Sequence, residues 1–253
     1  MLDKVLNLHF LDHCNFSCVH CFIDRQGRAL SLEQCKKILT LPFIKNNFYR
    51  INLAGGEPLL SPYIQELIDF IVEQGYQCSL ITNGSRLTTS FIERNRSKLT
   101  MIGISVDSLD DETNRRIGRF PLPELTKVCS AIKANGIKLK INICVGKLNM
   151  EEDFRKIIEL TNPDRLKILQ LMESKHINKA SELTISNEDF NKVCEKLKDF
   201  KPICEESEYM KKAYWIVDSE GYFSKDNLHD KISSINLLTI DNAYNPLEGG
   251  CFL

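Results

Sequence analysis

Residues 5–21 read Val-Leu-Asn-Leu-His-Phe-Leu-Asp-His-Cys-Asn-Phe-Ser-Cys-Val-His-Cys, an apolar run followed at once by a group of cysteines. The run predicts an opening strand over Val5–Leu11. Cys14, Cys18 and Cys21 have the spacing C-x3-C-x2-C, a more specific pattern than a lone C-x-x-C. Thiolates are the usual ligands of iron–sulfur clusters. These cysteines are suited to hold three corners of a [4Fe–4S] cluster and to leave one iron open to a small molecule.

Zinc is the competing interpretation of this loop. A structural zinc site takes four ligands, so His13 or His20 would have to complete it. Because His20 stands directly beside Cys21, its ring is awkwardly placed to bind the same ion. A non-catalytic zinc-binding α/β protein stays open as an alternative.

The rest of the chain alternates strand-like apolar runs with segments of helical periodicity. Strands are predicted at Val5–Leu11, Arg50–Leu53, Gln77–Ile81, Met101–Val106, Leu139–Val145 and Leu166–Leu171, and helices at Ser31–Ile38, Tyr63–Gln74, Thr88–Asn95, Glu124–Asn135 and Met150–Leu160. Strands that alternate with helices predict a parallel sheet with right-handed crossovers. Because the alternation fades after about residue 172, we expect an α/β fold with a partial (βα)6 TIM-like barrel instead of a closed one.

Residues 173–253 are predicted to form a C-terminal extension of the barrel of residues 1–172. The extension contains a helix at Asn187–Asp199 and a hairpin, whose turn Asp218-Ser219-Glu220-Gly221 joins Lys212–Val217 to Tyr222–Phe223. Parallel sheets bind ligands at the carboxyl ends of their strands. We expect the extension to pack on the barrel as one compact unit and to close the ligand site.

Composition excludes several classes of function. A formal net charge of −1 on 253 residues gives no global field that would attract a nucleic-acid polymer or an anionic membrane. Residues 1–12 mix charged with apolar side chains, unlike a signal peptide. No apolar run approaches the roughly 20 residues of a membrane span. We therefore expect a cytoplasmic protein without membrane association.

Most of the ten cysteines lie outside the cluster motif and are scattered along the chain, at Cys35, Cys78, Cys129, Cys144, Cys194, Cys204 and Cys251. Free cysteine behaves as a small buried hydrophobe, so we expect most of these to be core residues. They contain no C-x2-C pair, and we expect a single cluster.

A second motif, Ala54-Gly55-Gly56-Glu57-Pro58, follows the second predicted strand. By itself it fits a turn before a helix. Together with the cysteine motif it resembles the radical S-adenosylmethionine (SAM) superfamily. The resemblance implies a [4Fe–4S] cluster on Cys14, Cys18 and Cys21, and SAM as the cofactor bound to the open iron. It also implies that Gly55 and Gly56 let the backbone approach SAM, and that Glu57 accepts from the SAM amino group.

Three further residues at strand ends are assigned to SAM by the same resemblance. Asn83 follows the third strand, although Asn83-Gly84 is equally a simple turn signal. Ser105 ends the fourth strand and matches a residue that binds the ribose or the carboxylate. Arg119 matches an arginine that pairs with the carboxylate, a task suited to its fork of donors.

Within the superfamily, residues 5–218 resemble the viperin family, through segments that include 111–119, 140–142, 162–167 and 210–214. This start near the first strand resembles the compact prokaryotic members. The resemblance implies a monomeric antiviral enzyme that takes electrons from a flavodoxin- or ferredoxin-type donor. Its substrate is a nucleoside triphosphate, with CTP first and UTP or GTP next. The implied reaction is removal of the ribose 4′ hydrogen, loss of the 3′ hydroxyl as water, and addition of one electron and one proton, giving the 3′-deoxy-3′,4′-didehydro analogue.

The resemblance also implies the residues that act on this substrate. Tyr214 is the expected hydrogen donor, because a phenol supplies both an electron and a proton. The expected substrate-binding residues are Arg50, Asn52, Lys140, Asn142, Arg165 and Lys167.

Strand periodicity gives part of this set independent support. Lys140 and Asn142 share parity on one strand, and Arg165 and Lys167 share parity on the next. If both pairs face the barrel interior, three cations converge there, and an anionic ligand would offset their cost. The competing interpretation is that these side chains are solvated or pair with Glu173 or Asp164.

Three departures from the animal viperins put the base preference in doubt. Arg50 stands where they carry lysine, and Ala54 where they carry serine. Glu248 stands in Glu248-Gly249-Gly250, where an Arg-Gly-Gly helps to bind phosphate. A radical SAM enzyme acting on another small molecule or on a peptide is therefore the second alternative.

Overall fold

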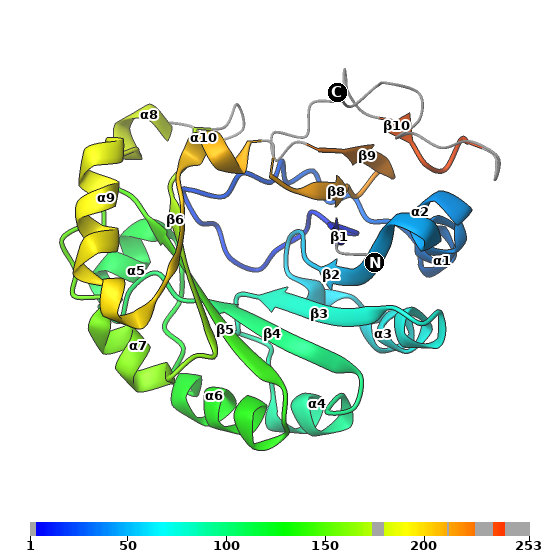
Figure 1. The fold of residues 1–253 in the computed structure, drawn as a ribbon, viewed down its shortest axis with the longest axis horizontal. Coiled ribbons are helices and arrows are strands. Elements are labelled where there is room, and N and C mark those ends of the chain that lie inside the picture. The colour runs from blue at the N-terminus through cyan, green and yellow to red at the C-terminus, as the bar shows by residue number, and fades with distance from the viewer. Residues whose placement is uncertain (1–3, 174–179, 212, 226–234, 241–253) are drawn as a thin grey trace.

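The structure is a computed structural model, and it describes residues 4–173, 180–211, 213–225 and 235–240. Its centre is a run of parallel strands: β1 (Lys4–Leu8), β2 (Phe48–Leu53), β3 (Gln77–Thr82), β4 (Leu99–Ser105), β5 (Lys138–Val145) and β6 (Arg165–Gln170). The strands curve into an open barrel, and the helices lie on its outer side (Figure 1). The predicted parallel α/β fold is confirmed. The first strand is shorter than predicted, because Leu11 leaves β1 and forms an isolated bridge with Ala29.

The sheet is longer than the six predicted strands, because the C-terminal segment adds strands at both sides. In order it is β10-β9-β8-β1-β2-β3-β4-β5-β6-β7. On one side β7 (Ile203–Glu205) pairs in parallel with β6, and on the other β8 (Trp215–Val217) pairs in parallel with β1. The predicted hairpin is β8 with β9 (Tyr222–Ser224), to which β10 (Ile235–Asn236) is added. These added strands have two or three residues, too few to show a periodicity.

The helices are α1 (Leu32–Thr40), α2 (Pro42–Asn47), α3 (Ile64–Glu73), α4 (Thr89–Arg94), α5 (Asp111–Ile117), α6 (Leu125–Ala134), α7 (Arg155–Thr161), α8 (Ala180–Leu183), α9 (Asn187–Lys196) and α10 (Ser207–Met210), with 3-10 turns η1 (Pro58–Leu60) and η2 (Lys198–Phe200). The helix predicted from Met150 begins only at Arg155. Asn149 explains this difference, because its side chain accepts from Gly146 N at 2.9 Å and donates to two carbonyls, which fixes a turn before the helix.

The short helix α5 was not predicted, although the sequence contains its signals. The Asp110 side chain accepts from Thr113 N at 2.7 Å, as an N-cap does, and Gly118 ends the helix with a left-handed backbone (φ 85°). This helix matters for function because its carboxyl end contacts the cluster loop, residues 14–21.

Alternation along the strands divides the sheet into an apolar and a polar face. On β1, Leu6 and Leu8 are buried in the hydrophobic core. Asn7, between them, faces the barrel interior and accepts there from Asn52 Nδ2 at 2.8 Å. Asn52 in turn accepts from Ser79 Oγ at 2.8 Å. The interior is therefore polar, unlike the outer face that packs on the helices.

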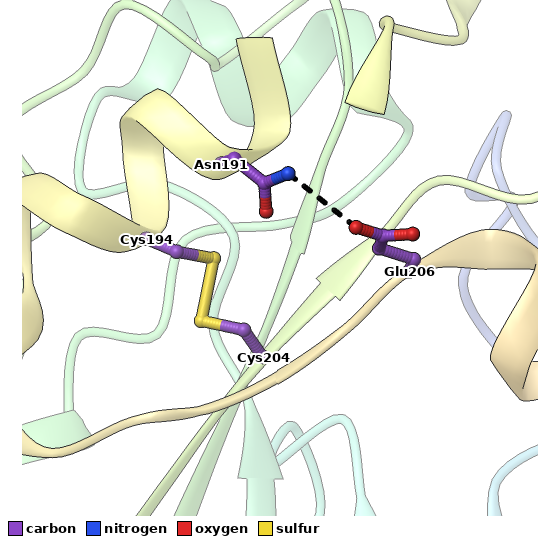
Figure 2. Close-up of a disulfide and its surroundings, with 4 residues drawn as sticks. All are labelled: Asn191, Cys194, Cys204 and Glu206. Atoms are coloured by element: carbon purple, nitrogen blue, oxygen red, sulfur yellow. Dashed lines mark hydrogen bonds between the residues drawn. A yellow bond between two sulfur atoms is a disulfide. The ribbon is translucent and has the colours of Figure 1, made fainter. Parts of the chain in front are cut away.

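Outside the cluster loop, Cys144 is free and only partly buried, and the other described cysteines fall into two kinds. Cys35, Cys78 and Cys129 are buried and free, as expected. Cys194 on α9 and Cys204 on β7 form a disulfide, which corrects the expectation of a single core thiol at each (Figure 2). Cys251 lies outside the described residues. Among the described helices none has the length and apolar character to cross a membrane.

Candidate active site

The cluster loop is held by the backbone at the end of α5. Ser17 N donates to Gly118 O at 3.2 Å, and Val19 N donates to Ile117 O at 2.8 Å. A Cβ at position 118 would lie 2.4 Å from Ser17 O, so only glycine permits this contact. The loop that carries the cysteines is thus fixed by a residue 100 positions further along the chain.

The three cysteines of this loop are free and partly buried. Burial raises the pKa of Cys18 to about 11 and also raises that of Cys21, and neighbouring thiolate charges act in the same direction. A bound cationic cluster would reverse this effect, because metal coordination deprotonates a thiol. Three thiols on one loop, close enough to repel as thiolates, fit the ligand set of an iron–sulfur cluster.

A single-ion site is not formed by the residues that the structure describes. They contain no group of three or more His, Cys, Asp and Glu side chains that could hold one metal ion. His20, the candidate fourth zinc ligand, instead lies with Nε2 3.2 Å from Asp107 Oδ2. This contact disfavours the zinc alternative.

The Gly-Gly-Glu motif packs against the segment that leads into the cluster loop. A Cβ on Gly55 would lie 2.3 Å from Leu11 O, and one on Gly56 only 1.9 Å from His13 O. Gly56 N donates to Leu11 O and Glu57 N donates to His13 O, both at 2.8 Å. Glycine is thus required at both positions by a backbone contact inside the protein, which was not predicted from the sequence. Their approach to SAM stays a prediction.

Glu57 is fully buried and already hydrogen-bonded. Its Oε1 accepts from Thr82 Oγ1 at 2.7 Å and from Leu59 N at 3.0 Å, and its Oε2 accepts from Asn83 N at 2.7 Å. Burial raises the pKa of this carboxyl, and these hydrogen bonds oppose the rise. Glu57 therefore ties the motif to the end of β3. The predicted contact with the SAM amino group stays a prediction.

Asn83 joins the end of β3 to the cluster loop. Its Nδ2 donates to Asn15 Oδ1 at 3.0 Å and lies 3.7 Å from Cys14 Sγ. Its Oδ1 accepts from Ser85 N at 2.9 Å. Asn83 is thus beside the first cluster cysteine, as a residue of the cofactor site should be.

A cavity of about 210 Å³ opens next to the cluster loop. Its lining includes Phe16 of that loop, Asn83 after β3, Ser105 at the end of β4, and Arg119 with Phe120 after α5. The structure therefore brings together the three SAM residues that were predicted from separate strand ends. The cavity has apolar walls with a few polar groups, and Asn83 connects it to Cys14, which fits SAM bound next to a cluster.

Asp107 lies behind Arg119, a lining residue of this cavity, and was not predicted as a site residue. It is buried, accepts from Arg119 Nε, and accepts from Cys144 N at 2.8 Å. Burial alone would raise the pKa of Asp107, but the Arg119 guanidinium and His20 hold it well below its usual range. Arg119 is therefore already paired with a carboxylate, and its predicted contact with the SAM carboxylate would be an additional one.

The second group of predicted residues faces the barrel interior on β5 and β6. Lys140 lies opposite Arg165 and Asn142 lies opposite Lys167 in the parallel register, as the parity argument requires. Asn142 and Lys167 are 8% and 6% exposed, whereas Arg165 is exposed at the start of β6. Asn142 Oδ1 is buried without a hydrogen-bond partner among the described residues.

Lys140 is a cation of this group without a paired carboxylate among the described residues. Within the described part of the chain it makes no hydrogen bond or ion pair. Burial lowers its pKa, and the charges of Lys167 and Arg165 lower it further, to about 7. A half-buried ammonium beside two other cations is a site where an anion would be stabilised.

Lys167 pairs with a residue that sequence reasoning missed. Its Nζ lies 2.6 Å from Glu205 Oε1 on β7, and it also donates to the Tyr214 hydroxyl. The partners expected in the competing interpretation were wrong for Lys167. Asp164 instead accepts from Leu139 N at 2.7 Å, and Glu173 makes no ion pair with a described residue. Glu205 gave no signal because its strand has three residues.

Arg50 and Asn52 lie on β2, at the other side of the interior. Asn52 belongs to the chain of amides from Asn7 to Ser79. Arg50 is half-buried near the amino end of the strand, and its Nη2 donates to Gln77 Oε1 at 2.8 Å. Glu248, which raised a question about phosphate binding, lies outside the described residues.

Comparison with known proteins gives the same assignment as the site. Residues 8–161 match the Radical SAM superfamily. An S-adenosylmethionine-dependent nucleotide dehydratase from a Thermoplasmatales archaeon (strain ISO4-H5) is 31% identical over 89% of this chain and 84% of its own length. A protein of the same name from Flammeovirga pacifica is 31% identical over 93% and 87%.

Solved structures resemble the chain in fold alone. Streptococcus suis SuiB bound to S-adenosylmethionine superposes with a TM-score of 0.76 at 19% identity, over 98% of this chain and 67% of that one. Native anSMEcpe with bound AdoMet and a peptide superposes with a TM-score of 0.72 at 14% identity, over 94% and 79%.

Proposed function

This chain belongs to the radical SAM superfamily, among the S-adenosylmethionine-dependent nucleotide dehydratases, and on that premise we propose which nucleotide it uses and what it makes. The proposed substrate is a nucleoside triphosphate, with CTP first and UTP or GTP next. The proposed product is the 3′-deoxy-3′,4′-didehydro analogue, and the proposed role is antiviral defence, as in the viperin family.

The observation that carries the proposal is the charge of the barrel interior. Lys140, Arg165 and Lys167 lie on neighbouring strands, and among the described residues Lys167 alone of the three has an ion-pair partner, Glu205. Asn142 adds a buried oxygen that accepts no hydrogen bond within the described part of the chain. A triphosphate would compensate the excess cations, and a sugar hydroxyl would supply the missing donor.

The two halves of the site have separate tasks in this proposal. Cys14, Cys18 and Cys21 hold the cluster, and Asn83, Ser105 and Arg119 line the cavity assigned to SAM. When bound, these cofactors supply a 5′-deoxyadenosyl radical that removes the ribose 4′ hydrogen.

The chain's own interior residues then act on the substrate. Lys140, Arg165 and Lys167 bind the phosphates and so orient the ribose. Tyr214 stands next to Lys167 and is the proposed source of the hydrogen that completes the reaction.

Electrons must come from outside the site. We propose a flavodoxin- or ferredoxin-type donor, because the chemistry consumes single electrons. We also propose that the enzyme acts as a monomer in the cytoplasm. These assignments rest on the family resemblance.

A nucleotide panel tests the proposal. The reconstituted enzyme is incubated anaerobically with SAM, dithionite and each of CTP, UTP, GTP and ATP, and products are measured by mass spectrometry. We expect at least one base to give a product lighter by one water, together with 5′-deoxyadenosine. If none of the four does so, the substrate is another small molecule or a peptide, and the triphosphate proposal is wrong.

A further inference from the structure

We propose that Glu205 is a positioning residue, which holds the Tyr214 hydroxyl and the Lys167 ammonium in one fixed arrangement at the substrate. The inference deepens the proposed function and rests on it for the role of Tyr214. Glu205 itself is not assigned a contact with the substrate. It acts through the two side chains that are.

The three side chains form a closed ring of contacts. Glu205 Oε1 lies 2.6 Å from Lys167 Nζ, and Glu205 Oε2 accepts from the Tyr214 hydroxyl. Lys167 Nζ also donates to the Tyr214 hydroxyl and lies 4.6 Å from the centre of its ring. Each member is thus fixed by the other two, so removal of the carboxylate releases both the phenol and the ammonium.

The ring joins parts of the sheet that backbone pairing does not join. Glu205 ends β7, beside β6, whereas Tyr214 immediately precedes β8, which pairs with β1 on the other side of the sheet. The segment between them contains α10 and crosses the open side of the barrel (Figure 1). Glu205 therefore sets where Tyr214 lies relative to the cations of β5 and β6.

Stability alone does not account for this arrangement. Glu205 and Lys167 are only 8% and 6% exposed. Burying two charges costs about as much as their attraction returns, so an apolar pair of similar size would often be as stable. A positioning role explains why a carboxylate is present. Burial and the hydrogen bond to Glu205 also raise the pKa of Tyr214, which keeps the phenol protonated and able to donate.

The test uses the product formed per SAM cleaved. In Glu205→Gln we expect 5′-deoxyadenosine still to form while the ratio of product to 5′-deoxyadenosine falls about tenfold or more, because a misplacement of one ångström costs up to about a hundredfold. A merely structural defect would lower SAM cleavage and product together and leave their ratio unchanged.

Four further variants test this result. Glu206→Gln is the matched control, because Glu206 is the neighbouring carboxylate and instead accepts hydrogen bonds from Asn191 (Figure 2) and from Asn187. It should keep the wild-type ratio. Tyr214→Phe should lose product like Glu205→Gln, and the double variant should lose no more than Tyr214→Phe alone. Glu205→Asp, which keeps the charge, should recover part of the ratio.

A titration of the phenol separates this inference from the proposed function. The ionisation of Tyr214 is followed by ultraviolet difference spectra of wild type against Tyr214→Phe, with no substrate present. We expect its pKa to lie well above 10 in wild type and to fall in Glu205→Gln. An ordinary pKa in wild type, or a wild-type product ratio in Glu205→Gln, overturns the role of Glu205. A wild type with the raised pKa but no product from any triphosphate overturns the proposed function instead.

Discussion

The cluster end of the site and the cationic interior of the barrel are built in different ways. At the cluster end, backbone meets backbone: Gly56 packs on His13 O, and Gly118 packs on Ser17 O. In the interior, long side chains from β5, β6 and β7 meet, and Lys167, Glu205 and Tyr214 contact one another. The cluster end is therefore held by rigid backbone contacts, whereas the interior is formed by charged side chains that a ligand could bind.

This difference shows which part of the site can vary. A side chain at Gly56 or Gly118 would collide with a main-chain carbonyl, which cannot move without moving its whole loop. Lys140, by contrast, has no hydrogen-bond or ion-pair partner among the described residues, so its replacement disturbs little besides the local charge. We therefore expect changes at the cluster end to abolish the chemistry, and changes in the interior to alter substrate binding by degrees.

The largest effect is expected when one cluster ligand is removed. Cys18→Ala should reduce 5′-deoxyadenosine formation to background, because two thiolates cannot hold the cluster in place of three. Binding of CTP in the interior, measured by calorimetry without SAM, should remain. Iron and sulfide content and the absorbance near 400 nm of the anaerobically reconstituted proteins would be compared with wild type.

The matched control is Cys129→Ala, which removes a free, buried cysteine of α6 outside the cluster loop. It should retain iron, sulfide and SAM cleavage. Undiminished 5′-deoxyadenosine formation by Cys18→Ala would contradict the cluster assignment. A colourless wild type with one bound zinc would favour the zinc-binding alternative.

Much of the cluster end could be predicted because its signals are local in the sequence. The cysteine spacing and the Gly-Gly-Glu motif each occupy eight residues or fewer. Asn83, Ser105 and Arg119 were assigned to SAM through the family resemblance, and all three line one cavity. The parity of Lys140 and Asn142 with Arg165 and Lys167 was also readable, because alternation is a rigid property of a strand.

Other parts of the site depend on contacts between distant segments, which leave no local pattern in the sequence. Glu205 meets Lys167 only because a three-residue strand is added at the edge of the sheet. Asp107 meets His20 because α5 brings the cluster loop to the end of β4. A buried lysine such as Lys167 is expected to pair with a carboxylate, but the position of that carboxylate in the chain cannot be predicted from the sequence.

A smaller effect is expected when Lys140, which has no ion-pair partner among the described residues, is replaced. Lys140→Met should weaken CTP binding about 10- to 100-fold, because a hydrogen bond to a charged group contributes about 1.5–3 kcal/mol. Iron content and substrate-free SAM cleavage should stay at wild-type levels. Lys138→Met, an exposed lysine on the same strand, is the control and should bind CTP normally. Equal affinity of Lys140→Met and wild type would remove Lys140 from the phosphate site.

The same residue predicts a pH dependence of binding. Because the pKa of Lys140 is lowered to about 7, the free protein loses this positive charge as the pH rises through 7. CTP binds the protonated form better, so its affinity should fall from pH 7 toward pH 9, and binding in that range should take up a proton. In Lys140→Met this part of the pH dependence should disappear.

The stability of the free protein should show the opposite trend. An unfolded lysine keeps its proton up to about 10.5, whereas Lys140 in the fold releases it near 7. The unfolded state therefore binds more protons between these values, and the contribution of Lys140 to stability rises with pH across that window. Urea unfolding of wild type and Lys140→Met at several pH values measures the difference. A contribution that falls with pH would contradict the lowered pKa.

The smallest effect is expected at the Cys194–Cys204 disulfide, which lies outside both regions (Figure 2). Glu205 faces the interior, so by alternation its neighbour Cys204 faces outward, toward α9. The bond closes a loop with a sequence separation of 10, and loops of this size are stabilised by about 2–3 kcal/mol. Cys204→Ser should lose about that much unfolding free energy in urea without reductant, and nothing relative to wild type in dithiothreitol. Product formed per SAM cleaved should not change. A lower ratio of product to 5′-deoxyadenosine in Cys204→Ser would mean that the outer face of β7 also fixes Glu205. The position of the interior charges would then depend on this edge of the sheet as well.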